Sequence, residues 1–129
     1  MTIASYNDLL NEARQQPDSQ RLLFVFTRAE LPDHPSVEQR LHFKEGKGGV
    51  LIPMLCVDKA LEGLSNMKDL REESKATGVE WNIVFVAAMT DQGSELAERQ
   101  LDRMVEAIKV GNIDSYLAFD QDGEIVSFQ

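Results

Sequence analysis

The chain has 129 residues, one cysteine and a formal net charge of −9, from 13 Lys and Arg against 22 Asp and Glu. This length predicts a single domain, residues 1–129, that can bury enough surface to fold without a disulfide or a structural metal. The acidic surface disfavours nucleic-acid binding, because the basic residues are scattered singly among acids. The lone cysteine fits a reducing compartment, and we find neither a signal-peptide pattern nor a membrane-length apolar run, so we expect a cytoplasmic bacterial protein without membrane contact.

The first third of the chain predicts a helix, a strand and a second helix. Ser5 and Asp8 form a capping-box variant at the start of the first helix, which Pro17 ends. Residues 22–27 are apolar at every position but the last, which predicts a strand that is buried on both faces. A loop with two prolines follows, and a short helix is expected from Ser36 to about residue 45.

The middle of the chain predicts a second strand and another helix. Residues 50–57 are apolar but contain Pro53, which cannot donate to a sheet ladder, so this strand is expected at an edge or with a bulge. The secondary structure of residues 58–64 is ambiguous, and we interpret them as one helical turn. Ser65 is the expected cap of a helix that reaches about residue 76, although its apolar stripe is thin.

Residues 81–109 carry the clearest pattern. The strand from Trp81 to Met89 is apolar on both faces, and a long amphipathic helix with Ser94 as its N-cap follows. Gly111 is the expected left-handed stop of this helix. The apolar stripe of the helix consists of Ala97, Leu101, Met104, Val105 and Ile108.

The last residues predict two short strands, 115–119 and 124–128, that pair as a hairpin. The intervening residues 120–123 suit a type I turn with Gly123 in the left-handed position.

The alternation of strands and helices predicts an α/β fold of three layers around a mostly parallel sheet. The expected strand order is about 2-1-3-4-5, a flavodoxin-like arrangement with a C-terminal antiparallel hairpin. The alternative is an α+β layout with all helices on one face. It is disfavoured because strands 22–27 and 83–88 have no solvent face.

Side chains that could carry chemistry have simpler structural interpretations. Cys56 has aliphatic neighbours, which favours a buried core residue over a nucleophile. His34 and His42 match no zinc spacing, so no metal is expected. The glycines of residues 46–49 follow a helix and precede a strand, the reverse of a phosphate loop. No cofactor is therefore expected.

The fold prediction yields one candidate ligand site. Ligands of open parallel sheets bind beyond the carboxyl ends of the strands. Arg28 could hold a carboxylate or phosphate there, assisted by the free N–H groups at the start of the long helix. The rival interpretation is that polar residues gather at strand ends because loops meet water, with Asp91 capping the helix. The residues of this predicted rim are Thr27, Arg28, Asp58, Lys59, Thr90, Asp91 and Ser94.

Several segments together resemble a known family. These are residues 22–26, 31–32, 56–59, 81–88 and 103–108. On them the chain is similar to a family of small bacterial proteins of about this length, often labelled ribonucleotide reductase subunit alpha. The resemblance implies a whole-chain domain and supplies no catalytic residue. A ribonucleotide reductase catalytic subunit needs several redox cysteines, and the single Cys56 excludes that activity.

The sequence leaves two functions open. The first is a non-enzymatic accessory or protein-interaction domain, with another protein as partner. The alternative is a protein or enzyme that binds a small anion or nucleotide at the predicted rim.

Overall fold

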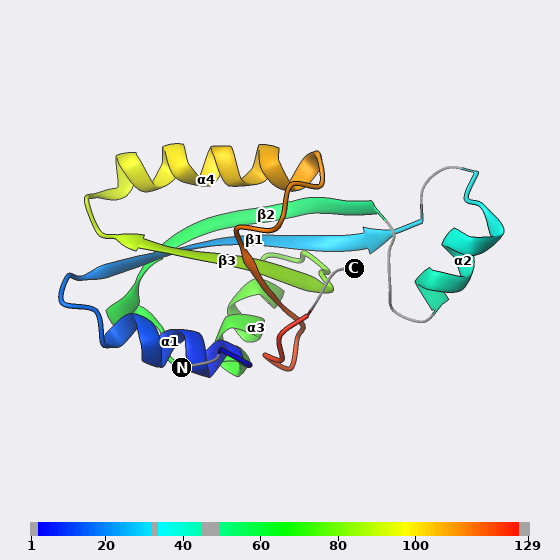
Figure 1. The fold of residues 1–129 in the computed structure, drawn as a ribbon. Coiled ribbons are helices and arrows are strands. Elements are labelled where there is room, and N and C mark those ends of the chain that lie inside the picture. Colours follow the sequence, from blue (N-terminus) through cyan, green and yellow to red (C-terminus); the bar gives the residue numbers. More distant parts are fainter. Residues whose placement is uncertain (1–2, 32–33, 45–49, 127–129) are drawn as a thin grey trace.

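The computed structural model describes residues 3–31, 34–44 and 50–126. Four strands form one sheet, with helices on both of its faces (Figure 1). The elements in chain order are α1 (Tyr6–Arg14), β1 (Gln20–Glu30), α2 (Val37–Lys44), β2 (Val50–Ala60), the 3-10 turn η1 (Leu61–Gly63), α3 (Met67–Lys75), β3 (Ile83–Thr90), α4 (Ser94–Lys109) and β4 (Leu117–Phe119). No helix in these ranges has both the length and the apolar content needed to cross a membrane.

The direction of the strands corrects the predicted fold. The sheet order is β2-β1-β3-β4, which matches the expected neighbours of the first four strands, but every neighbouring pair is antiparallel. The expectation of a mostly parallel, flavodoxin-like sheet of five strands is therefore wrong. Because β1 runs against both of its neighbours, its carboxyl end lies at the opposite end of the sheet from theirs.

The connection between β1 and β2 explains this difference. Glu30 pairs directly with Val50, so the two strands form a hairpin, and α2 projects beyond its end (Figure 1). A parallel crossover needs a helix that packs back onto the sheet. In α2, however, Val37 and Leu41 are exposed, and neither belongs to the core. Without that packing the chain returns alongside β1 in the opposite direction.

Both faces of the sheet are nevertheless covered. Leu22, Phe24 and Phe26 of β1 belong to a core shared with α1 and α3. Leu23 and Val25, which point the other way, belong to a second core with α4. A strand that is apolar on both faces thus indicates two covering layers and does not distinguish a parallel from an antiparallel sheet. The alternative with all helices on one face is excluded too.

Helix boundaries follow the local signals with two shifts. Ser5 Oγ accepts the Asp8 N–H at 3.2 Å, as the capping box predicts. Asn66 caps α3 in place of Ser65. Gly93, at φ 101°, occupies the N-cap position of α4, so Ser94 is its first helical residue and not its cap. The buried face of α4 matches the predicted stripe, with Ala97, Leu101, Met104 and Ile108 buried.

The position of β2 agrees with the prediction from Pro53. β2 lies at the sheet edge, and its register slips where Phe26 faces Leu55 and Thr27 faces Pro53, which leaves Met54 as the extra residue of a bulge.

The C-terminal turn also forms as expected. The Gly123 N–H donates to the Asp120 carbonyl at 3.1 Å, and Gly123 has φ 81°. After this turn the expected hairpin is reduced, within the described residues, to an isolated bridge between Phe119 and Ile125. Residues 127 and 128 of the predicted last strand lie outside the described residues.

Candidate functional site

The antiparallel sheet divides the predicted rim between two ends of the molecule. Lys59 pairs with Leu22 and Thr90 with Gln20, so both lie where β1 begins. Arg28 pairs with Ile52, near the carboxyl end of β1. The residues at the first end are Asp58, Lys59, Thr90, Asp91 and Ser94, whereas Thr27 and Arg28 lie at the second.

The guanidinium at the first end belongs to Arg21, whereas the sequence predicted Arg28 at this position. Its Nε lies 2.6 Å from Asp58 Oδ2, and its Nη1 lies 3.6 Å from Asp91 Oδ2. The hydrogen bond that Arg21 donates to the Asp58 carboxylate raises the pKa of Arg21 above its ordinary value. Lys59 pairs in turn with Glu73 of α3. The charges at this end are thus paired, and they tie β1 to β2 and to the end of β3.

The remaining residues of this end are more open. Thr90 and Ser94 are exposed. Thr90 also borders a groove of about 520 Å³ between β3 and α4, which Leu96 and Arg103 line from the helix. Asp91 Oδ1 accepts the Gly93 N–H at 3.1 Å, as expected for a carboxylate that helps to start α4.

The two residues at the second end have different environments. Thr27 is fully buried, and its Oγ1 donates to the Ile83 carbonyl at 2.9 Å, so its hydroxyl serves the contact between β1 and β3. Arg28 is 40% exposed and its Nε lies 2.8 Å from Glu30 Oε1. Arg28 also borders a cavity beside Trp81, which the rim prediction did not include.

Cys56 is exposed on the edge strand β2, so the prediction of a buried core residue is wrong. Partial desolvation of the thiol raises its pKa, and the charge of Asp102 on α4 raises it further. Its apolar neighbours in the sequence wrongly indicated burial, because an edge strand exposes side chains that an inner strand would bury.

The other polar candidates add no chemical centre. His34 is exposed and has φ 56°. Within residues 3–31, 34–44 and 50–126, no group of three or more His, Cys, Asp or Glu side chains could hold a metal ion. The side chain of His42 and the glycines of residues 46–49 lie outside what the structure describes.

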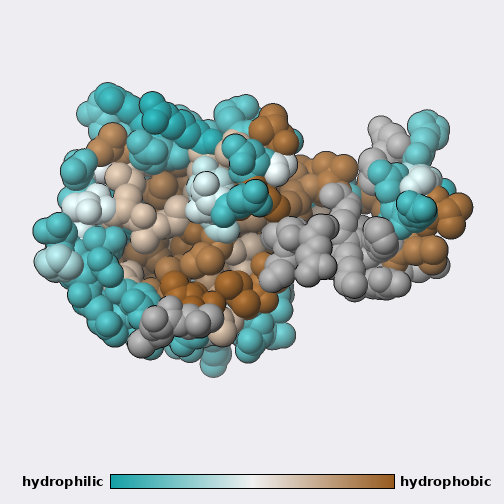
Figure 2. All heavy atoms as spheres, viewed as in Figure 1, coloured by the Kyte–Doolittle hydropathy of each residue, from teal (hydrophilic) through white to brown (hydrophobic). Residues whose placement is uncertain are grey.

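The exposed apolar side chains are concentrated on a projecting part, which we call the arm: α2, residues 34–36, and the adjoining Leu31 and Val50. In Figure 1, α2 stands apart from the sheet and its covering helices, beyond the arrowhead of β1. Figure 2 shows brown, apolar side chains on this projection. Four of the six large apolar side chains that the described residues expose lie here: Leu31 (37%), Val37 (74%), Leu41 (53%) and Val50 (45%).

Comparison with known proteins gives no family or relative. No family model matches the chain, and neither a curated protein nor a solved structure matches it. The resemblance drawn from the sequence therefore stays an expectation.

Proposed function

We propose that this protein is a non-enzymatic, cytoplasmic protein-interaction domain and that the arm contacts its partner. The observation that carries the proposal is the gathering of exposed apolar side chains on one projecting element. Scattered apolar residues are normal on a protein surface, but a group of them on a segment outside the core marks an interaction site.

The physics of α2 supports a role completed by a partner. The helix has 8 residues, which is short for stability on its own, and its exposed Val37 and Leu41 belong to neither core. Burial of such side chains contributes roughly 1.5–3 kcal/mol each when it is complete. A partner with an apolar recess would thus stabilise α2 while gaining affinity from it.

The alternative at the predicted rim has less support. A ligand anion there would compete with Asp58 and Asp91 for the guanidinium of Arg21. Cys56 lies outside this rim, and its raised thiol pKa does not favour a nucleophile at neutral pH. We also propose, from the single cysteine, that the protein is not a ribonucleotide reductase catalytic subunit.

The test compares capture of partner proteins by matched variants. The purified chain, a Val37→Asp/Leu41→Asp double variant and a Val110→Asp control are immobilised and exposed to lysate. Val110 is 78% exposed at the C-cap of α4 and is not part of the arm, so the control adds a charge at a similarly open position.

We expect one partner to bind the native chain and the control but not the double variant. Melting temperatures of all three should agree, because none of the changed side chains belongs to the core. Equal capture of that partner by the double variant would contradict the proposal.

A further inference from the structure

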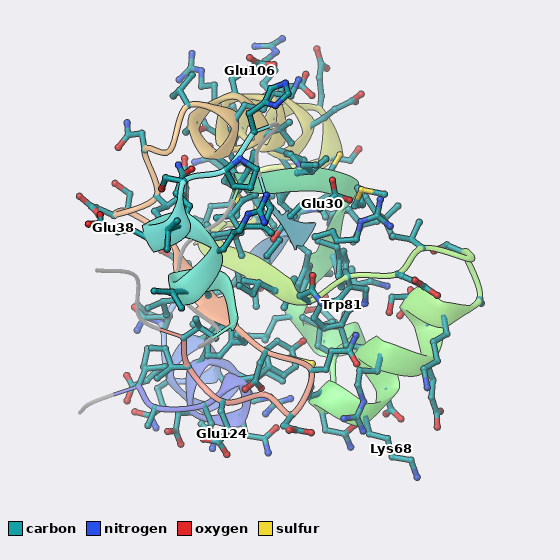
Figure 3. The ribbon with its side chains drawn as sticks, turned by 90° about the vertical axis from the view of Figure 1, so that its right-hand side faces the viewer. Glu30, Glu38, Lys68, Trp81, Glu106 and Glu124 are labelled. Carbon is teal, nitrogen blue, oxygen red and sulfur yellow. The ribbon has the colours of Figure 1, made fainter. Side chains whose placement is uncertain are left out.

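The cavity beside Trp81 collects positive charge in an otherwise acidic protein. It has a volume of about 290 Å³ and lies at the end of the sheet that Figure 3 faces, where Glu30 and Trp81 are labelled. Arg28 of β1, and Arg71 and Lys75 of α3, line it, and Glu80 is the one acid that does so among the described residues. Three of the 13 basic residues thus border one small cavity of a chain whose net charge is −9.

The cations of this cavity are weakly engaged. Asp122, which lies 3.5 Å from Arg71 Nη1, has an 84% exposed side chain, and Glu30, the partner of Arg28, is 42% exposed. Ion pairs this open to water contribute little and can exchange with another anion. Within the described ranges no carboxylate lies within ion-pairing distance of Lys75.

The wall behind the cations is held in place by hydrogen bonds. Trp81 Nε1 donates to Ser74 Oγ at 2.8 Å, and both side chains are buried. Gln121 Nε2 donates to the Trp81 carbonyl at 2.6 Å, while Arg71 Nη1 donates to the Gln121 carbonyl at 2.7 Å. These bonds position the guanidinium of Arg71 against a fixed surface, which reduces the cost of ordering it around a ligand.

The groups that remain free at the cavity are mainly donors. Asn82 Oδ1 accepts the Ala29 N–H at 2.9 Å, so its amide N–H groups are left for other partners. Arg28 and Arg71 each have further guanidinium N–H groups beyond the bonds described, and Lys75 adds an ammonium. Two guanidiniums, an amide and an ammonium around one cavity match a ligand that is rich in acceptor oxygens and negatively charged.

We propose that this cavity binds a small organic anion that carries a phosphate group or several carboxylates. Arg28 and Arg71 bind its oxygens, and Lys75 balances the remaining charge. The volume is at the low end for ligand sites, which suits one small metabolite. The site is separate from the apolar side chains of the arm, so this inference does not depend on the proposed interaction function.

Trp81 makes the test direct, because it is the single tryptophan of the chain and forms part of the wall. Its fluorescence is followed while the native chain is titrated with pyrophosphate, citrate or neutral glycerol at constant ionic strength. We expect a saturable change with pyrophosphate, with citrate or with both, and none with glycerol. A response to one anion alone identifies the group that the site prefers.

Variants separate specific binding from a general charge effect. Lys75→Gln removes a cation without removing an ion pair. Arg71→Gln removes a cation that also donates to the Gln121 carbonyl. Each variant should weaken anion binding by about tenfold or more. Arg99→Gln is the control, because Arg99 forms an exposed pair with Glu95 on α4. If neither anion gives a saturable change, or if Lys75→Gln binds as tightly as Arg99→Gln, the proposal is overturned.

Discussion

At the scale of single residues, Tyr6 has opposing effects on the stability of the fold. Its ring stabilises the core by packing, whereas its buried hydroxyl lowers stability. The ring lies 6.3 Å from that of Phe24 and 6.0 Å from that of Phe119, measured between centroids. Its hydroxyl is the one buried side-chain polar atom without a hydrogen-bond partner among the described residues. Such burial costs roughly 1–3 kcal/mol.

Tyr6→Phe should therefore leave the free energy of unfolding unchanged or raise it by about 1 kcal/mol. Tyr6→Ala, which removes the ring as well, should lower it by about 3–5 kcal/mol. Chemical denaturation of both variants measures the difference. A clear loss of stability in Tyr6→Phe would show that the hydroxyl has a partner in the folded protein.

The same hydroxyl predicts a dependence on alkaline pH. Burial raises the pKa of Tyr6 above its ordinary value of 10.0. The folded protein thus holds this proton more tightly than the unfolded chain, so the contribution is complete below pH 10 and is lost as the pH rises beyond it. We expect the free energy of unfolding to fall more steeply above pH 10 in the native chain than in Tyr6→Phe. Parallel slopes would contradict this.

Cys56 should react with thiol reagents in the native state, but slowly. It is exposed, so labelling should go to completion without denaturant. Its pKa is raised by partial desolvation and by Asp102, which lowers the fraction of reactive thiolate at neutral pH. We expect a rate below that of free cysteine and a faster reaction in Asp102→Asn, measured by the absorbance of the released reporter. A thiol that reacts only after unfolding would refute the exposed position.

At the scale of elements, α4 is the helix whose burial the sequence indicated best. Leu101 is 5% exposed and packs in the core that β1 and β3 share with α4, whereas Glu98 on the same helix is exposed. Leu101→Ala should lower the free energy of unfolding by about 2–5 kcal/mol, because it leaves a cavity over the sheet. Glu98→Ala should change it by less than about 0.5 kcal/mol. Equal denaturation midpoints would mean that the buried face is misassigned.

At the scale of the whole molecule, the arm should be dispensable for folding. Glu30 and Val50 pair directly, and the described residues of α2 belong to neither core. Replacing residues 31–49 by Asn-Gly, a favoured two-residue hairpin turn, should leave unfolding cooperative and the melting temperature unchanged or higher, since a shorter loop costs less entropy to close. A fall of more than about 10 °C would show that the arm supports the sheet. The same variant should lose the partner that the arm binds.

The sequence by itself determined the features that depend on neighbours along the chain. The spacing of Leu101, Met104 and Ile108 indicated the buried face of α4, and Ser5 indicated the start of α1. Pro53 indicated an edge strand or a bulge, because a residue without an N–H cannot donate to a regular ladder, and the structure has both. Each signal acts within a few residues or through a property of one residue, so no knowledge of the fold is needed to use it.

Only the tertiary structure decided the direction of β2 and, with it, the location of every candidate site. Direction depends on whether the segment after β1 packs on the sheet, and no local pattern in β1 or β2 encodes that. The antiparallel pairing of β1 with β2 and with β3 brings Arg21 to Asp58 and Asp91, and it places Arg28 at the opposite end. There Arg28 lines the same cavity as Arg71 and Lys75, which are more than forty positions away along the chain. This is possible because α3 packs with Trp81 and β1 in one core.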